Sequence, residues 1–471
     1  MPAEPRPIGG SGAGGRFTGV FASAVIVAAA GVFVALFVLN VTNWASYAGT
    51  LSGLLYHFVL PLAAAGGILA LLRLGPQGRL AAALSLGAVV PALYLTELTL
   101  GLRARSAPAG AATAFDGRGK LDVIMDRRRR GIEAYPAMRA RAMLVEGPGG
   151  GLVSALGGDG LLPLASLPGA GIVSCNESGR WMVFDSDRHG FHNPVGVWDA
   201  GPPALALVGD SFTQGDCVPS DKNIAAHLRR RFGGVLNLGV SGHGPLAELA
   251  AVKEYLAAVR PPVVAWLYFE GNDLFKDLPE ERRSPVLMSY LTGGFTQNLM
   301  ARRDELRKRF KAYLDARLVD AMGRVDHPYL ATLDFLKLFH LRETFGLDPV
   351  ALGVARRVTE DNLRLLKGIL QEARRTVASW GGRFVFVFMP DTPRYFAAPR
   401  DSRIRDRVRG RVLDLAQGLG LPVIDVHGAI AAHPDPQALF VYPGSHFNEA
   451  GYKAAAEAIA KGLEKVGAKH P

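Results

Sequence analysis

The fold is decided by the stretch Gly209-Asp210-Ser211-Phe212-Thr213-Gln214-Gly215, which directly follows the apolar run Ala204–Val208. A buried strand that ends in Gly-Asp-Ser and turns into a helix places a serine hydroxyl at the carboxyl edge of a sheet, where open α/β sheets have their sites. The start of the following helix offers N–H groups and the positive end of its dipole to an oxyanion. For this stretch alone, an Asp-Ser pair that merely caps a helix is the alternative.

Three further blocks follow along the chain. They are Asn237-Leu238-Gly239-Val240-Ser241-Gly242, Glu270-Gly271-Asn272-Asp273 after the strand-like Val263–Phe269, and Tyr442-Pro443-Gly444-Ser445-His446-Phe447-Asn448 before a helix-like tail. In this order the serine, glycine, asparagine and histidine blocks resemble the SGNH (GDSL-type) hydrolase superfamily over about residues 204–465. The resemblance implies a flavodoxin-like α/β/α sandwich that hydrolyses or transfers acyl groups on oxygen.

The resemblance also implies a role for each block. Ser211 is expected to be the nucleophile and His446 the base that accepts its proton, since a serine hydroxyl is weakly nucleophilic without one. The oxyanion hole would combine the backbone N–H groups of Ser211 and Gly242 with the side-chain amide of Asn272. We expect no cofactor and no metal.

Two positions depart from the superfamily pattern. Glu270 stands where the third block usually has its first glycine, and Pro443 stands where an aspartate usually orients the histidine. Proline cannot hold the imidazole in one tautomer. The site therefore works as a Ser–His dyad, takes an acid from elsewhere, or uses a backbone carbonyl. Asp391 and Asp425, both at predicted strand ends, are the first candidates for a replacement acid.

The N-terminal part of the chain is of a different kind. No Lys, Arg, Asp or Glu occurs from Phe17 through Leu72, and a second apolar run, Leu80 to Leu102, is broken only by Glu97. About 20 apolar residues span a bilayer as a helix. The sequence therefore predicts three membrane spans, Thr18–Leu39, Leu51–Leu72 and Leu80–Gly101.

The short loops predict the orientation of these spans. Arg6 and Arg16 precede the first span, and Arg73 and Arg79 flank the second loop. The positive-inside rule places both segments in the cytoplasm. Everything after Leu102 is then extracytoplasmic, so we expect a multi-pass protein of the inner (plasma) membrane with a periplasmic catalytic domain.

The resulting organisation has four parts. We predict a cytoplasmic tail (1–16), three transmembrane helices (17–102), a linker and accessory lead-in segment (103–200), and an SGNH hydrolase-like domain (201–471) with a helical insertion at about 278–363. Within the insertion, Asn298–Met322 is predicted as an amphipathic helix with a basic face. This face is either simply solvated or covers the active site and faces anionic headgroups or an acidic polysaccharide.

The lead-in segment contains Gly190-Phe191-His192-Asn193, which resembles the lead-in of envelope-associated SGNH proteins. His189 and His192 have no carboxylate or cysteine at ligand spacing, so we predict a structural role for them. The only cysteines are Cys175 and Cys217. They either form a disulfide that pins this segment to the catalytic loop or are two small buried residues.

Together these features predict a membrane-anchored serine esterase or O-acyltransferase that acts on acyl esters of an envelope or exported glycan. Its partners would be the lipid bilayer, an acylated glycan or lipid substrate and, for a transferase, a membrane acyl-donor protein. The net charge of +11 comes without a nucleic-acid-binding motif, so nucleic acid is not expected. The alternatives are a catalytically silent SGNH-like glycan-binding or assembly subunit, and a lipid esterase or thioesterase at the membrane surface.

Overall fold

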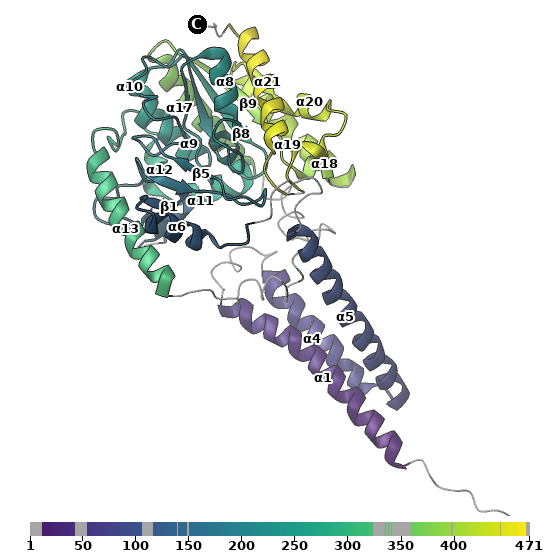
Figure 1. Ribbon diagram of the computed structural model, residues 1–471. Helices are drawn as coiled ribbons and strands as arrows, with labels where there is room; N and C mark the ends of the chain where they lie inside the picture. The colour runs from purple at the N-terminus through teal and green to yellow at the C-terminus, as the bar shows by residue number, and fades with distance from the viewer. Residues whose placement is uncertain are drawn as a thin grey trace, which may run out of the picture. The chain divides into compact units, whose positions relative to one another are not determined.

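The computed structural model describes residues 12–42, 54–105, 116–138, 140–147, 150–323, 335, 338, 341, 359–396, 399–442 and 444–467. The chain divides into two compact units, which are described separately (Figure 1). A helical unit comprises residues 1–106 and 326–354, and an α/β unit comprises residues 107–325 and 355–471. Most of the predicted tail, linker and second half of the insertion lies outside the described residues.

The helical unit is built from apolar helices: α1 (Gly12–Thr42), η1 (Leu55–Val59) continuing into α4 (Leu60–Ala70) and η2 (Leu71–Arg73), and α5 (Pro76–Arg105). Among the described residues, three stretches are long and apolar enough to cross a membrane, namely Thr18–Val41, Leu55–Arg73 and Pro76–Leu100. Helix α1 packs against α4 and α5. The buried Asn40 side chain donates to the carbonyl of His57 at 2.8 Å, which gives its amide N–H a partner among apolar helices.

The α/β unit is organised around one parallel sheet. Its strands are β6 (Leu205–Gly209), β7 (Val235–Asn237), β8 (Val263–Phe269), β9 (Arg383–Met389) and β10 (Val423–Asp425), in the order β10-β9-β8-β6-β7. This is the flavodoxin-like order, in which the topological switch point lies between the first and third strands of the sheet. Here these strands are β6 and β8, so the predicted α/β/α fold is confirmed.

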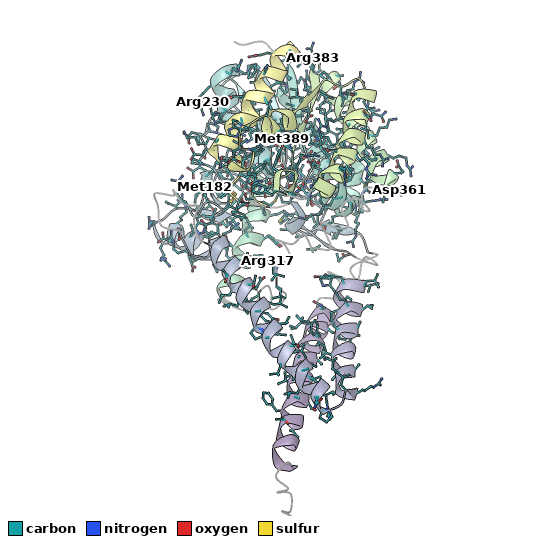
Figure 2. All side chains as sticks on the ribbon, turned by 90° about the vertical axis from the view of Figure 1, so that its right-hand side faces the viewer. Met182, Arg230, Arg317, Asp361, Arg383 and Met389 are labelled. Carbon is teal, nitrogen blue, oxygen red and sulfur yellow. A yellow bond between two sulfur atoms is a disulfide. The ribbon has the colours of Figure 1, made fainter. Side chains whose placement is uncertain are left out.

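Helices cover both faces of this sheet (Figure 1). Because alternate strand residues point to opposite faces, Leu205 and Leu207 pack with one set of helices, and Ala206 and Val208 pack with the other. The first set is α8 (Ile224–Phe232), α20 (Val426–Ala431) and α21 (Glu449–Lys465). The second is α9 (Pro245–Ala251), α17 (Glu360–Ala378) and α19 (Pro399–Gly418). In Figure 2, Met389 lies deep within this unit, whereas the exposed Arg230 and Arg383 lie at its outer edge.

The accessory lead-in segment belongs to the same compact unit as the parallel sheet. It contains α6 (Lys120–Arg129), a three-stranded sheet of β1 (Ala134–Pro136), β4 (Gly171–Val173) and β5 (Val183–Asp185), and a pair of strands, β2 (Leu144–Glu146) and β3 (Leu152–Ser154), which follows η3 (Ala140–Met143). Its apolar side chains share one continuous core with α9 and α17. The segment is therefore part of the α/β unit rather than a separate compact unit.

The amphipathic helix predicted in the insertion is α13 (Arg303–Gly323). Its apolar side chains Leu306 and Phe310 are buried in the core. Its basic face meets acids of the lead-in segment: Arg309 binds Asp159 at 2.8 Å and Arg307 binds Glu133 at 2.7 Å. These ion pairs attach α13 to the lead-in segment. They give no support to the alternative in which its basic face covers the active site and faces an anionic ligand.

Short helices complete the α/β unit: α7 (Ser211–Gln214), η4 (Val252–Leu256), α10 (Ala257–Val259), η5 (Asp273–Asp277), α11 (Leu278–Glu281), α12 (Pro285–Ser289), α18 (Pro393–Phe396) and η6 (Gln437–Leu439). Two of them, α7 and η5, directly follow β6 and β8. They begin at the edge where the four sequence blocks meet.

Candidate active site

The predicted nucleophile, Ser211, is the first residue of α7 and sits on a sharp turn after β6. A Cβ atom on Gly209 would lie 2.2 Å from Thr213 Oγ1 and 2.8 Å from the Leu267 carbonyl oxygen, so glycine is required there. The carboxylate of Asp210 accepts the backbone N–H of Phe212 at 3.0 Å and caps the helix. The turn that caps the helix therefore also positions the predicted nucleophile. Ser211 is only 7% exposed.

The predicted base, His446, lies opposite this serine. It stands just before α21, whose first turn is capped by the side chain of Asn448. The Nε2 atom of His446 is 2.8 Å from Ser211 Oγ, and the ring packs against that of Phe212 at 4.9 Å between centroids. Two residues 235 positions apart thus form the hydrogen bond that proton transfer from the serine needs.

The far side of the imidazole is held by Glu177, which the sequence did not indicate. One carboxylate oxygen, Oε1, lies 2.9 Å from His446 Nδ1, and the other, Oε2, accepts the backbone N–H of His446 at 2.9 Å. Glu177 lies in the turn that connects β4 to β5. The structure therefore contains a Ser–His–Glu chain in place of a dyad or a backbone carbonyl.

The prediction that Asp391 or Asp425 replaces the missing aspartate is wrong, because Glu177 lies at His446 Nδ1. Asp391 is bound by the guanidinium of Arg405 at 2.8 Å. Asp425 is bound by Arg409 and caps α20 by accepting the backbone N–H of His427. Both arginines come from α19, so the two carboxylates at the strand ends are already neutralised. Pro443, which raised the question, lies outside the described residues.

The charge of Glu177 also sets the protonation of the base. Burial lowers the pKa of His446, but the hydrogen bond and negative charge of Glu177, together with the charges of Asp216 and Asp210, raise this pKa to about 9. The side chains of His446 and Glu177 keep exposures of 20% and 22%. With this pKa the imidazole is mostly protonated at neutral pH, and once it has lost this proton it is a strong base for the proton of Ser211.

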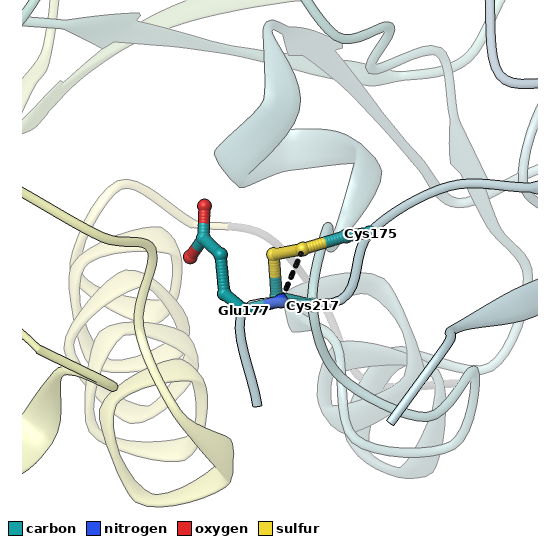
Figure 3. Close-up of side chains that lie close together, drawn as sticks. All are labelled: Cys175, Glu177 and Cys217. Atoms are coloured by element: carbon teal, nitrogen blue, oxygen red, sulfur yellow. Dashed lines mark hydrogen bonds between the residues drawn. A yellow bond between two sulfur atoms is a disulfide. The ribbon is translucent and has the colours of Figure 1, made fainter. Parts of the chain in front are cut away.

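Cys175 and Cys217 form a disulfide with Cα atoms 5.0 Å apart, which decides between the two alternatives left open by the sequence. Figure 3 shows Glu177 beside this bond, with its backbone N–H directed at Cys175 Sγ at 3.4 Å. The three residues lie as close together as metal ligands do, but both sulfurs are bonded in the disulfide and offer no thiolate ligand. The bond joins the segment that carries the acid to the loop that carries the nucleophile.

The histidines of the lead-in segment have structural contacts. His192 uses both ring nitrogens, Nδ1 at 2.9 Å from the Gln214 carbonyl oxygen and Nε2 at 2.7 Å from Ser220 Oγ, and its ring stacks on Phe184. Burial lowers the pKa of His192 to about 4, so the ring is neutral at physiological pH. It ties the lead-in segment to the end of the nucleophile helix.

The glycine and asparagine blocks adjoin the same edge of the sheet. A Cβ on Gly239 would lie 2.2 Å from the backbone nitrogen of Gln214, so this block packs directly on α7. Gly242 takes the left-handed conformation at φ 75°, which favours glycine. Asn272 stands at the start of η5, and its buried Oδ1 has no hydrogen-bond partner among the described residues. The oxyanion-hole roles of Ser211, Gly242 and Asn272 stay predictions.

Glu270, which replaces a glycine of the superfamily pattern, has a structural partner. Its carboxylate pairs with Arg394, and both side chains are 3% exposed. It also accepts the backbone N–H of Asp391 at 3.2 Å. The glutamate at this position thus forms a buried ion pair. The pair connects the loop that contains Asn272 to the segment that follows β9.

The chain matches the model of the GDSL-like lipase/acylhydrolase family over residues 207–454. Among solved structures it is similar to TesA (14% identity, covering 56% of this chain and 98% of that one, TM-score 0.31) and to the lipase/acylhydrolase from Enterococcus faecalis (13%, 56% and 96%, 0.31). It is also similar to a two-domain esterase active on acetylated mannans (13%, 58% and 52%, 0.31). No curated protein matches the chain.

The family match covers more than half of the chain and includes every block on which the resemblance rested. Ser211 and His446 both fall within it, at the carboxyl edge of a flavodoxin-like sheet. The chain belongs to the GDSL-like lipase/acylhydrolase family, within the SGNH hydrolases.

Proposed function

We propose that this protein is a membrane-anchored serine esterase or O-acyltransferase whose catalytic unit lies outside the cytoplasm and acts on acyl esters of an envelope or exported glycan. The observation that carries the catalytic part is the chain of hydrogen bonds from Ser211 through His446 to Glu177. The silent-subunit alternative was motivated by a missing acid. Glu177 supplies a carboxylate at the position where that acid is needed.

Two observations support the location. The three apolar helices are long enough to span a membrane, and the charges around them favour an extracytoplasmic α/β unit. Disulfides persist in oxidising compartments such as the periplasm and are rare in the cytoplasm. The bond between Cys175 and Cys217 therefore fits the same side of the membrane.

The proposed substrate class rests on this proposed location. Acyl esters outside the cytoplasmic membrane are carried by envelope and exported glycans and by lipids. The net charge of +11 favours an anionic polymer over a neutral one. If water accepts the acyl group the protein is an esterase, and if a sugar hydroxyl accepts it the protein is an acyltransferase.

A substrate panel on the full-length protein in nanodiscs tests this function. The panel contains p-nitrophenyl esters of increasing chain length, acetylated oligosaccharides and phospholipids, and both free acid and acylated acceptor are measured. We expect the highest kcat/KM for short acyl esters and release or transfer of acyl groups on the oligosaccharides. Activity confined to long acyl chains or phospholipids would instead identify a lipid esterase or thioesterase, and a complete absence of turnover would favour the silent subunit.

Fusions to full-length protein test the topology. With three spans after a cytoplasmic N-terminus, an alkaline phosphatase moiety fused after residue 471 should be active, and a green fluorescent protein moiety at the same place should be dark. Fusions within the loop at residues 74–76 serve as the internal control and should give the reverse. A fluorescent, phosphatase-inactive C-terminal fusion would place the catalytic unit in the cytoplasm and contradict the proposal.

A further inference from the structure

Glu177 reaches the active site from a turn that is far away in sequence. It lies 269 residues before His446, in the connection between β4 and β5. The ladder between these strands extends toward the turn, since Ser174 N–H donates to the Met182 carbonyl and Met182 N–H to the Cys175 carbonyl. Beyond Cys175 the backbone leaves this ladder, so the strands alone do not fix where the carboxylate lies.

Two other polar side chains of this turn bind away from the active site. Asn176 Nδ2 donates to the carbonyl of Asp116 at 2.7 Å, and Trp181 Nε1 donates to the carbonyl of Arg118 at 2.9 Å. These bonds attach the turn to the segment before α6, which contains none of the predicted catalytic residues. They hold the turn in shape without fixing the distance from Glu177 to the imidazole.

The covalent attachment of this turn to the nucleophile loop is the disulfide. Cys175 lies two residues before Glu177, and Cys217 lies six residues after Ser211. Beside the bond, Ser174 Oγ donates to Asp216, which also accepts the side-chain amide of Gln214 at 2.9 Å. The covalent link thus lies where the acid-bearing turn and the end of the nucleophile loop meet.

The backbone at Cys217 adopts an uncommon conformation next to this link. Cys217 has φ 69°, in the left-handed region that residues other than glycine rarely occupy and that persists only where the surroundings enforce it. Reduction would let this residue relax toward ordinary backbone angles. The carboxylate of Glu177, with 22% of its side chain exposed, could then exchange the imidazole for water.

We infer that the Cys175–Cys217 disulfide is a positioning bond for catalysis: it holds Glu177 on His446, so that the enzyme reaches full turnover only in the oxidised form. This inference rests on the proposed function. A dithiol reductant would attack Sγ of the partly exposed Cys175, with the buried Cys217 thiolate leaving, and its second thiol would then release Cys175. Two thiols and an oxidised reductant result. A disulfide oxidant of the glutathione type reverses the exchange by taking two electrons and two protons.

The test measures ester turnover of the full-length protein in nanodiscs for four forms: the wild type, the double variant Cys175→Ser/Cys217→Ser, Glu177→Gln, and the combination of all three changes. The double variant should lose at least about tenfold in kcat, but less than the roughly ten-thousandfold expected for loss of the acid. In the Glu177→Gln background the two cysteine changes should cost less than about twofold, because residues that act as one unit are not additive. The acid limb of the pH profile of the double variant should move to lower pH, since His446 loses its carboxylate.

Reversible reduction of the wild type separates this role from general destabilisation. Dithiothreitol should lower kcat at unchanged circular dichroism, and oxidised glutathione should restore it. Two results would overturn the inference while leaving the proposed function intact. One is an equal loss of kcat from the cysteine changes with and without Glu177→Gln. The other is a cysteine double variant with the same kcat as a catalytically active wild type. An oxidised wild type that neither hydrolyses esters nor reacts with a fluorophosphonate probe would instead refute the proposed function.

Discussion

Replacing Ser211 by alanine should lower kcat for the best ester substrate by about a millionfold, because the reaction then has no nucleophile and retains only binding and oxyanion stabilisation. The hydroxyl lies 2.8 Å from His446 Nε2 at the first residue of α7. Alanine is compatible with this helical position, so folding should be preserved. Steady-state kinetics and labelling by a fluorophosphonate probe, which forms a covalent bond with an activated serine, report the change.

Ser379→Ala is the matched control. This serine is exposed at the end of α17, and its hydroxyl bonds only locally, to the carbonyl of Thr376. The control should label and turn over like the wild type. Continued labelling of Ser211→Ala at the wild-type rate would mean that another residue is the nucleophile.

Replacing Glu177 by glutamine should lower kcat by roughly ten-thousandfold, the loss seen in other serine enzymes when the orienting acid becomes an amide. The two oxygens of Glu177 have different partners here: Oε2 accepts the fixed backbone N–H of His446, and Oε1 faces Nδ1. Glutamine has one acceptor, which the backbone N–H will take. Its amide N–H then faces Nδ1 and favours the tautomer with the proton on Nε2, which cannot accept the proton of Ser211.

The pH profile distinguishes this effect from simple loss of structure. The base must be neutral, so kcat/KM of the wild type should rise with pH as His446, with its pKa raised to about 9, loses its proton. Removing the negative charge of Glu177 lowers that pKa. The acid limb of Glu177→Gln should therefore lie at lower pH than that of the wild type, even though its maximal rate is far smaller.

Asp425→Asn provides the comparison for Glu177→Gln. It makes the same acid-to-amide change at a residue that pairs with Arg409 and caps α20, a position where asparagine also caps well. Its turnover and pH profile should stay close to those of the wild type. A loss in Asp425→Asn comparable to that of Glu177→Gln would contradict the assignment of the orienting acid.

The parallel sheet and the pair Ser211–His446 could be predicted because their signals are local. Each of these residues follows a strand or precedes a helix within a short block, and the order of the blocks determines where parallel strands end. The same kind of local signal led to the wrong prediction of Asp391 and Asp425 as the orienting acid, since both stand at strand ends. Their arginine partners come from α19, and no local pattern shows that Arg405 and Arg409 face the sheet edge.

Glu177 was missed for a related reason. Its contact with His446 depends on how the lead-in segment packs beside the sheet, and a lone glutamate in a turn is ordinarily solvated. The one feature of the sequence that could have indicated Glu177 was the pair of cysteines. A bond between Cys175 and Cys217 was among the alternatives, and it would have brought the neighbouring carboxylate within reach of the nucleophile loop.

The family-matched region, residues 207–454, contains the nucleophile and the base but neither Glu177 nor Cys175. A gene trimmed at that boundary would encode a chain that lacks the carboxylate bound to His446 and leaves Cys217 without its disulfide partner. The same arrangement offers a search pattern for related sequences: a Cys-x-Glu upstream, a cysteine six positions after the GDS serine, and no aspartate before the histidine. In chains that carry it, we expect the acid to come from the upstream segment, as Glu177 does here.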